Sequence, residues 1–179
     1  LLSFAIATGL FFGRFSKPTA FLKFSHNAII APYGDITGLM VRVTPFKNTN
    51  FTDAEAKVTL GMAIEENGVL TNKFFSLELE LQKINALTLS WTLVHPITEN
   101  SPLYQFSKED YERINGEILV FIKTFDDMFS NTVAIRTSYT FDEVVYGAKF
   151  KSMYARSQDN SKTVLHLDLL NAYDEVALN

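Results

Sequence analysis

The sequence predicts a mainly β protein with one main domain, built as a β-sandwich or barrel. Three observations lead to this prediction. Many short segments alternate apolar and polar residues, which is typical of half-buried strands. Turn signals separate these segments, and the Asn-Gly pair at 67–68 is the strongest of them. The chain has 179 residues, is 47% hydrophobic and contains 16 Phe, a residue that favours pleated surfaces.

The chain begins with an uncharged stretch, residues 1–13, which Arg14 ends. A helix of this length covers about 20 Å, whereas the hydrocarbon core of a bilayer is about 30 Å thick. Nothing basic precedes Leu1, which argues against a secretory signal peptide. From the residues alone, a buried core helix and the C-terminal part of a transmembrane helix both remain open. In the second interpretation, Arg14 and Lys17 reach toward lipid headgroups at the cytoplasmic end.

An alternating pattern replaces the helical one after Pro18. Apolar residues occupy every second position over 57–64 and again over 75–81, and the Asn-Gly turn signal lies between the two segments. This arrangement predicts a β-hairpin. A third one-sided strand is predicted over 87–93.

The second half of the chain contains one helical signal among further strands. Ser107-Lys108-Glu109-Asp110 resembles a capping box, so we expect a short helix over 108–114. The segment 117–125 is typical of a more fully buried strand. Further strands are predicted over 132–141, 144–150 and 163–170. There is no internal repeat and no low-complexity linker to divide the chain.

Charge and composition exclude several classes of function. The net charge of −4 argues against duplex nucleic acid as a partner, because binding it requires clustered Lys and Arg. The chain has no cysteine, which excludes a disulfide framework and a thiolate site. That composition is compatible with the cytosol.

Catalytic and metal-binding signals are missing from the sequence. The three histidines, His26, His95 and His166, lie far apart without a second ligand at metal spacing, which favours a solvated or hydrogen-bonded structural role for each. Asp126 and Asp127 resemble a carboxylate pair, but neighbours on a strand point to opposite faces, so a turn is the simpler interpretation. No phosphate loop or nucleophile elbow occurs. We therefore expect neither an enzyme nor a bound metal or cofactor.

Five segments resemble the inward-rectifier potassium channel family, and its bacterial members in particular. They occur in the order and with the spacing of that family across nearly the whole chain. The first resembles the cytoplasmic end of the pore-lining inner helix. The segments are ATGLFFGRFSKP (7–18), FSHNAII (24–30), LMVRV (39–43), LSWTLVHPITENSPLY (89–104) and IRTSYTFDEVVYGAKF (135–150).

The resemblance implies a homotetramer in the cell (inner) membrane, whose immunoglobulin-like cytoplasmic domains extend the ion pathway. It divides the chain into the C-terminal part of the inner transmembrane helix (1–13), a membrane-to-cytoplasm tether (14–23) and the immunoglobulin-like domain (24–179). Residues after about 14 are then cytoplasmic. The selectivity filter, a loop of backbone carbonyls, is not in this chain. Passive K⁺ transport with gating by this part of the channel is the implied function.

By similarity, Phe12 falls where the four inner helices converge. A ring of four such side chains can stop ions by dewetting a constriction, although a lipid-facing position is the alternative. Arg14 and Lys17 lie at the membrane boundary, where anionic lipid attracts each by about 1 kcal/mol. Thr19-Ala20-Phe21 stands where eukaryotic members carry further basic residues of a phosphoinositide site. We expect weaker or different lipid regulation.

The family pattern also assigns a cytoplasmic pore loop to KTFDD (123–127). This similarity implies that Thr124, Phe125 and Asp126 lie near the channel axis. The alternative is that the segment is only a tight β-turn.

The same comparison suggests which charges surround the ion pathway below the membrane. Asp53 aligns with an acidic position that attracts Mg²⁺ and polyamines in strong rectifiers, and Glu80 is a possible addition. Four carboxylates about 8 Å from a cation contribute roughly 2 kcal/mol in water before screening by salt. However, Lys123 and Phe4 stand where strong rectifiers carry acids. The hypothesis is therefore weak rectification, with K⁺ as the permeant ion and Mg²⁺ or polyamines as blockers.

A second class of function remains open. A membrane-anchored immunoglobulin-like binding module without a pore also fits an apolar segment followed by a β-sandwich, because such sandwiches serve many functions.

Overall fold

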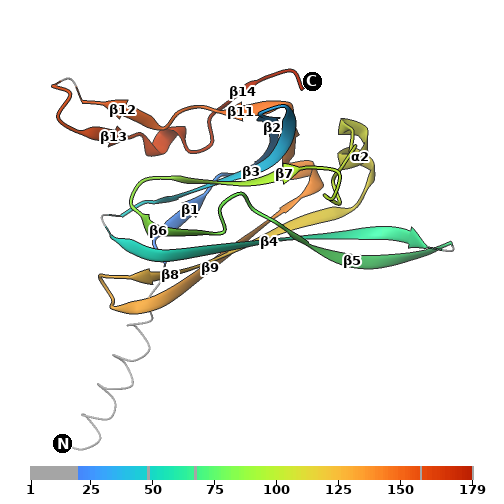
Figure 1. Ribbon diagram of the computed structural model, residues 1–179, viewed down its shortest axis with the longest axis horizontal. Helices are drawn as coiled ribbons and strands as arrows, with labels where there is room; N and C mark the ends of the chain where they lie inside the picture. The colour runs from blue at the N-terminus through green and yellow to red at the C-terminus, as the bar shows by residue number, and fades with distance from the viewer. Residues whose placement is uncertain (1–19, 48, 67, 158, 179) are drawn as a thin grey trace, which may run out of the picture.

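Two β-sheets form the body of the molecule in the computed structural model, which describes residues 20–47, 49–66, 68–157 and 159–178. Figure 1 shows the sheets as two layers, with sheet A above sheet B. The predicted mainly β sandwich is confirmed. The domain boundaries at 13 and 23 stay a prediction.

Sheet A contains the strands from the first part of the chain and two later ones. Its antiparallel ladder pairs β3 with β1, β2 and β7, and β10 adds to β2 in parallel. The strands are β1 (Leu22–Phe24), β2 (Ala28–Tyr33), β3 (Ile36–Pro45), β7 (Trp91–Ile97) and β10 (Val144–Tyr146).

Sheet B is antiparallel throughout, in the order β5-β4-β8-β9, and β6 pairs with the first residues of β4. Its strands are β4 (Phe51–Glu66), β5 (Val69–Leu77), β6 (Lys83–Leu87), β8 (Gly116–Asp126) and β9 (Asn131–Thr140). The predicted β4–β5 hairpin is confirmed. Gly68 has φ +79, a conformation that glycine adopts without a steric penalty.

The core fills the space between the two sheets, because each strand turns alternate apolar side chains inward. Phe51, Leu60 and Ile118 from sheet B and Val43 and Leu93 from sheet A are at most 1% exposed. Tyr139 also fastens the layers together, since its hydroxyl donates to the Ser25 carbonyl at 2.7 Å. Burial raises the pKa of Tyr139 to about 12.

Helix α2 (Lys108–Arg113) is the predicted short helix, ending one residue earlier than expected. The predicted capping box is present, because the Ser107 amide donates to the Asp110 carboxylate at 2.9 Å. A similar box opens the 3₁₀ helix η1 (Phe141–Glu143), where the Thr140 amide donates to Glu143 at 3.0 Å.

Four predicted strands were wrong in extent, three of them in the sandwich and one in the C-terminal arm. The predicted strand 87–93 divides at 88–90, because the chain leaves sheet B after β6 and enters sheet A at β7. The strand predicted over 75–81 stops at Leu77, since the Glu80 amide donates to Val94 of β7 at 2.8 Å. Gly147, with φ +76, separates β10 from β11 (Ala148–Phe150) within the predicted strand 144–150.

The chain ends in an arm that extends from the sandwich (Figure 1). The arm contains a two-stranded hairpin, β12 (Tyr154–Arg156) with β13 (Thr163–Leu165). The strand predicted over 163–170 was wrong beyond 165, where the chain turns into the 3₁₀ helix η2 (Leu167–Leu169) before β14 (Tyr173–Glu175) pairs with β11.

Arg42 of β3 holds the two ends of this arm. Its guanidinium donates to the carbonyls of Lys151, at 2.8 Å, and Leu169, at 3.4 Å. The same group lies over the Phe150 ring at 4.3 Å. The Arg42 side chain is therefore buried as a clamp between sheet A and the arm.

Candidate functional site

The outer face of sheet B carries most of the described candidate residues. Along β8, alternate side chains point into the core and away from it. The outward ones include Leu119, Phe121, Lys123 and Phe125, and the three apolar residues among them are 38–43% exposed. So large an apolar content on an open sheet face is typical of an interaction surface.

Asp53 lies on this face, at an irregularity of strand β4. The β4–β8 register shifts between Thr52 and Glu55, and Asp53 has φ +50. Such a bulge re-aims a side chain relative to its neighbours. The Asp53 carboxylate lies 3.4 Å from the Lys83 ammonium of β6, and both side chains are largely exposed.

Glu55 lies between two lysines in the strand register. It pairs with Lys83 of β6 on one side and with Lys123 of β8 on the other, so all three side chains share one face. The Glu55 carboxylate lies 3.4 Å from the Lys57 ammonium. We call Asp53, Glu55, Lys57, Lys83 and Lys123 the charged patch. It holds two carboxylates and three ammonium groups, a formal charge of +1.

The predicted pore-loop residues do not share one surface. Phe125 points outward, whereas Thr124 and Asp126 are buried, at 1% and 0% exposed. The Thr124 hydroxyl donates to the Thr52 carbonyl at 2.8 Å. This difference follows from the pleat, because successive residues of a strand point to opposite faces.

Asp126 organises the turn that joins β8 to β9. Its Oδ1 accepts from the amides of Met128, at 2.8 Å, and Phe129, at 3.4 Å. Its Oδ2 is buried without a hydrogen-bond partner among the described residues. The carboxylate therefore fixes the hairpin from inside, while Met128 and Phe129 expose about half of their side chains.

An aromatic cluster connects this hairpin to the start of the described chain. The Phe21 ring lies 6.0 Å from the Phe129 ring and 5.7 Å from the Phe46 ring, between centroids. The Lys47 ammonium lies 3.8 Å above Phe21, and Lys23 lies 5.0 Å above Phe46. Sequence reasoning missed this cluster because its members are far apart in the chain and share no motif.

Glu80 lies apart from the charged patch. Its segment, between β5 and β6, lies against β7, because the Glu80 amide donates to the Val94 carbonyl. A hydrogen bond from the Tyr33 phenol to the Glu80 carboxylate raises the pKa of Tyr33. Among the residues that the structure covers, Glu80 makes no ion pair with Lys83 or Lys123 of the charged patch. The suggestion that Glu80 adds to the Asp53 charge therefore gains no support from a contact.

His95 has the hydrogen-bonded structural role expected from the sequence. Its Nδ1 donates to the Glu78 carbonyl at 2.7 Å, and its Nε2 accepts from the Ser101 hydroxyl at 2.8 Å. Because a carbonyl only accepts, Nδ1 must carry the proton. Burial lowers the pKa of His95, so the ring stays neutral.

Phe12, Arg14 and Lys17 lie outside the described residues, so their assignments stay predictions. Within the described part of the chain, no helix has the length and apolar character needed to cross a membrane. No group of three or more metal-ligating side chains occurs in that part either.

Comparison with known families gives a match over almost all of the described chain. Residues 22–178 match the inward rectifier potassium channel C-terminal domain. The chain belongs to this family. The family and its relatives below are potassium channels, in agreement with the expectation that the chain is not an enzyme.

Two relatives illustrate the similarity. The inward rectifier potassium channel Kirbac3.1 of Paramagnetospirillum magnetotacticum is 27% identical over 165 residues, which are 92% of this chain and 56% of the relative. The ATP-sensitive inward rectifier potassium channel 12 of Rattus norvegicus is 26% identical over 155 residues, which are 84% of this chain and 36% of the relative. The chain thus spans about half the length of these relatives, or less.

A solved structure with partial likeness is the sporulation control protein Spo0M of Bacillus subtilis. It has a TM-score of 0.30 and 10% identity, covering 69% of this chain and 49% of that one. A likeness this low carries no argument about function.

Proposed function

We propose that this chain is the cytoplasmic vestibule and gating part of a homotetrameric, weakly rectifying potassium channel in the cell membrane. Family membership supports a channel of the inward rectifier type. In this proposal the charged patch and Phe125 face the ion pathway, where fourfold symmetry repeats each residue as a ring. K⁺ is the permeant ion, and no resident cofactor is required.

The charge balance of the patch is the observation that supports weak rectification. A ring of four Asp53 carboxylates without nearby cations would attract a polycation, which strong rectification requires. Here Lys83 lies 3.4 Å from Asp53, and Glu55 lies between Lys83 and Lys123 in register. At distances larger than the separation within these pairs, the fields of the opposite charges largely cancel, and salt screens the field that remains. The patch therefore offers Mg²⁺ and polyamines little attraction.

The hairpin β8–β9 supplies the cytoplasmic constriction in this proposal. Phe125 contributes the apolar ring, while Asp126 acts from inside by holding the turn amides of Met128 and Phe129. Phe12 provides a second constriction at the helix crossing. A large apolar side chain at either position stops ions by dewetting a narrow pore.

Anionic lipid headgroups are the membrane partner that the basic residues favour. Arg14 and Lys17 are the proposed contacts on the tether. Lys23 is the last residue of the tether, and Lys47 lies over the ring of Phe21, another tether residue. Each of these lysines gains about 1 kcal/mol near an anionic surface. A phosphoinositide headgroup is one such anion.

The test is current–voltage recording of the full-length protein, reconstituted in bilayers, with spermine on the cytoplasmic side. We expect a nearly linear relation and no block at micromolar spermine. Replacing Lys83→Glu and Lys123→Glu together changes each subunit by −4 in charge and should produce voltage-dependent block.

The matched control is Arg156→Glu with Lys162→Glu, two exposed charge reversals on the arm that also change each subunit by −4. Equal block in this control would show that total charge, rather than the patch, attracts the blocker. Micromolar block of the unmodified channel would contradict weak rectification, and absence of K⁺ flux would contradict the channel itself.

A further inference from the structure

A cleft of about 440 Å³ lies where the loop that joins β7 to α2 meets the segment that joins β5 to β6. Glu78 and Glu80 of the segment line this cleft, and so does Ser101 of the loop. His95 of β7 lines it as well, although the residue is only 5% exposed. The cleft therefore brings solvent to the edge of an imidazole that is otherwise buried.

His95 connects the segment to the loop through a directed set of hydrogen bonds. Its Nδ1 carries the ring proton and donates to the Glu78 carbonyl at 2.7 Å, because a carbonyl can only accept. The Ser101 hydroxyl donates to Nε2 at 2.8 Å, and its oxygen accepts from the Leu103 amide at 3.1 Å. Each donor in this set has an acceptor only while the ring is neutral.

A proton added at Nε2 disturbs this set of bonds. Both ring nitrogens then donate, so the Ser101 hydroxyl can no longer donate to the ring. Its oxygen accepts from Nε2 and from the Leu103 amide, and within the described part of the chain the hydroxyl has no third partner. A buried hydroxyl hydrogen without an acceptor and a buried positive charge are both unfavourable. The contact between the ring and the loop is therefore weaker in acid.

The charges around His95 do not remove this penalty. Burial has the largest influence and lowers the pKa of His95, while the carbonyl and the carboxylate of Glu78 oppose that change. The Glu80 carboxylate is engaged by the Tyr33 phenol. Glu99 belongs to the loop but does not line the cleft, and the β3 residue that pairs with His95 is apolar. The ring is therefore neutral at neutral pH and takes up a proton only in acid.

We propose that His95 is a proton-sensitive switch, which loosens the β7–α2 loop from the segment 78–80 when Nε2 takes up a proton. An ordinary histidine has a pKa of about 6.5, and the folded chain lowers this value. The stabilisation by the neutral ring is therefore complete above about pH 6.5 and is lost as the pH falls. Among the described residues, none of the charged patch lines this cleft, so the switch does not depend on the proposed ion pathway.

The experiment is an NMR titration of the 179-residue chain from about pH 8 to about pH 5. The imidazole nitrogen shifts of His95 report its tautomer and charge. The exchange rate of the Leu103 amide, corrected for the intrinsic rate at each pH, reports the loop. We expect the proton on Nδ1 at neutral pH and roughly tenfold faster Leu103 exchange once the ring is charged. Amides in the centre of β8 report global opening and should not change.

Two variants separate the titrating group from its partner. His95→Gln keeps a donor and an acceptor but cannot titrate, so the corrected Leu103 exchange should become independent of pH. Ser101→Ala removes the hydroxyl that donates to Nε2, so the ring should take up its proton at higher pH than in the unmodified chain. The matched control is His26→Gln, which removes an exposed histidine and should leave the Leu103 response unchanged.

Four results would overturn the proposal. They are a proton on Nε2 at neutral pH, no charging of His95 before the chain unfolds, unchanged Leu103 exchange after charging, and an equal loss of the response in His26→Gln and His95→Gln. If His95→Gln fails to fold, the titrations of the unmodified chain and of Ser101→Ala still decide the question.

Discussion

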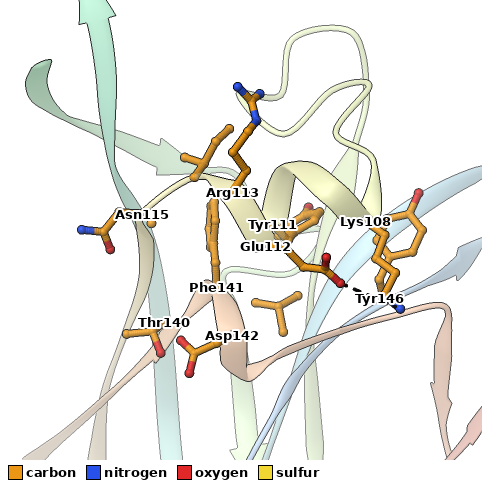
Figure 2. Close-up of a pocket in the computed structure, with 12 residues that line it drawn as sticks. Lys108, Tyr111, Glu112, Arg113, Asn115, Thr140, Phe141, Asp142 and Tyr146 are labelled. Atoms are coloured by element: carbon orange, nitrogen blue, oxygen red, sulfur yellow. Dashed lines mark ion pairs between the residues drawn. The ribbon is translucent and has the colours of Figure 1, made fainter.

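The two ends of strand β8 present the same physical problem and differ in how open they are. At the Asp126 end, a buried carboxylate oxygen lacks a partner inside a closed hairpin. At the Gly116 end, the buried Tyr111 hydroxyl lacks a partner among the described residues, although other atoms of Tyr111 line an open cleft between α2 and η1 (Figure 2). The comparison teaches that a buried group without a full set of partners is defined by the contacts that it does make. The Asp126 carboxylate still accepts from two turn amides, whereas the Tyr111 side chain is held by ring packing against Phe141 and Tyr146.

The largest expected effect is at the closed end. Asp126→Ala removes the acceptor of two turn amides and should lower the free energy of unfolding by about 3 kcal/mol. Urea denaturation of the chain measures this change. Asp126→Asn retains an Oδ1 acceptor and should recover most of the loss. If alanine and asparagine variants were equally stable, Asp126 would not fix the turn.

The open end is tested next by filling the space that Gly116 leaves. Gly116→Ala places a Cβ within 2.7 Å of three atoms of the Phe141 ring and should cost about 2 kcal/mol. Gly61→Ala is the matched control on the same sheet, where the Cβ meets the Phe74 ring at 2.9 Å. Phe74 is 70% exposed and can move aside, so this variant should lose less stability. Equal losses would mean that Phe141 is not rigidly held.

A smaller difference separates a satisfied tyrosine from an unsatisfied one. Tyr139→Phe removes the hydrogen bond to the Ser25 carbonyl and should lower the free energy of unfolding by about 1 kcal/mol. Tyr111→Phe removes a hydroxyl without a partner and should leave stability unchanged or slightly higher. Thermal unfolding of both variants at pH 7 measures this contrast. A large loss in Tyr111→Phe would indicate that its hydroxyl is already hydrogen-bonded.

The smallest expected effect is on stability at alkaline pH, and it does not appear at neutral pH. The pKa of Tyr139 is raised from 10.0 to about 12, so folding favours its protonated form. Its contribution is therefore complete below pH 10 and lost as the pH rises toward 12. Tyr139→Phe should flatten this part of the stability curve, measured by unfolding at several alkaline pH values. An unchanged alkaline slope would assign the effect to other groups.

The sequence predicted local structure well wherever one periodicity covered one element. The hairpin β4–β5 and helix α2 follow directly from alternation, the Asn-Gly signal and the capping box. Strand β8 was predicted in the right place, but the expectation of a more fully buried strand was wrong, because every second side chain of β8 points away from the core. The strand over 87–93 was wrong because the apolar alternation continues across the change from sheet B to sheet A. Alternation reports which face is buried and contains no information about the partner strand.

The candidate site was only partly predictable for the same reason. Asp53 and Lys123 were identified by resemblance, whereas Lys83 was missed because its pairing with β4 depends on the register of two distant segments. The Tyr111 cleft was missed because it requires α2, η1 and β10 to meet. Thr124 and Asp126 were grouped with Phe125 although alternation along a strand separates them.

The clamp at Arg42 has a consequence for how the molecule can change during evolution. One guanidinium binds the carbonyls of Lys151 and Leu169, and the Lys151 amide donates to Ala172 at 2.9 Å. The arm is thus a loop closed at its base, and lengthening such a loop costs little entropy. A change of length between 155 and 165 should therefore leave the sandwich in place and alter stability little. The position of the arm on sheet A is set by its base at Arg42 and not by its tip.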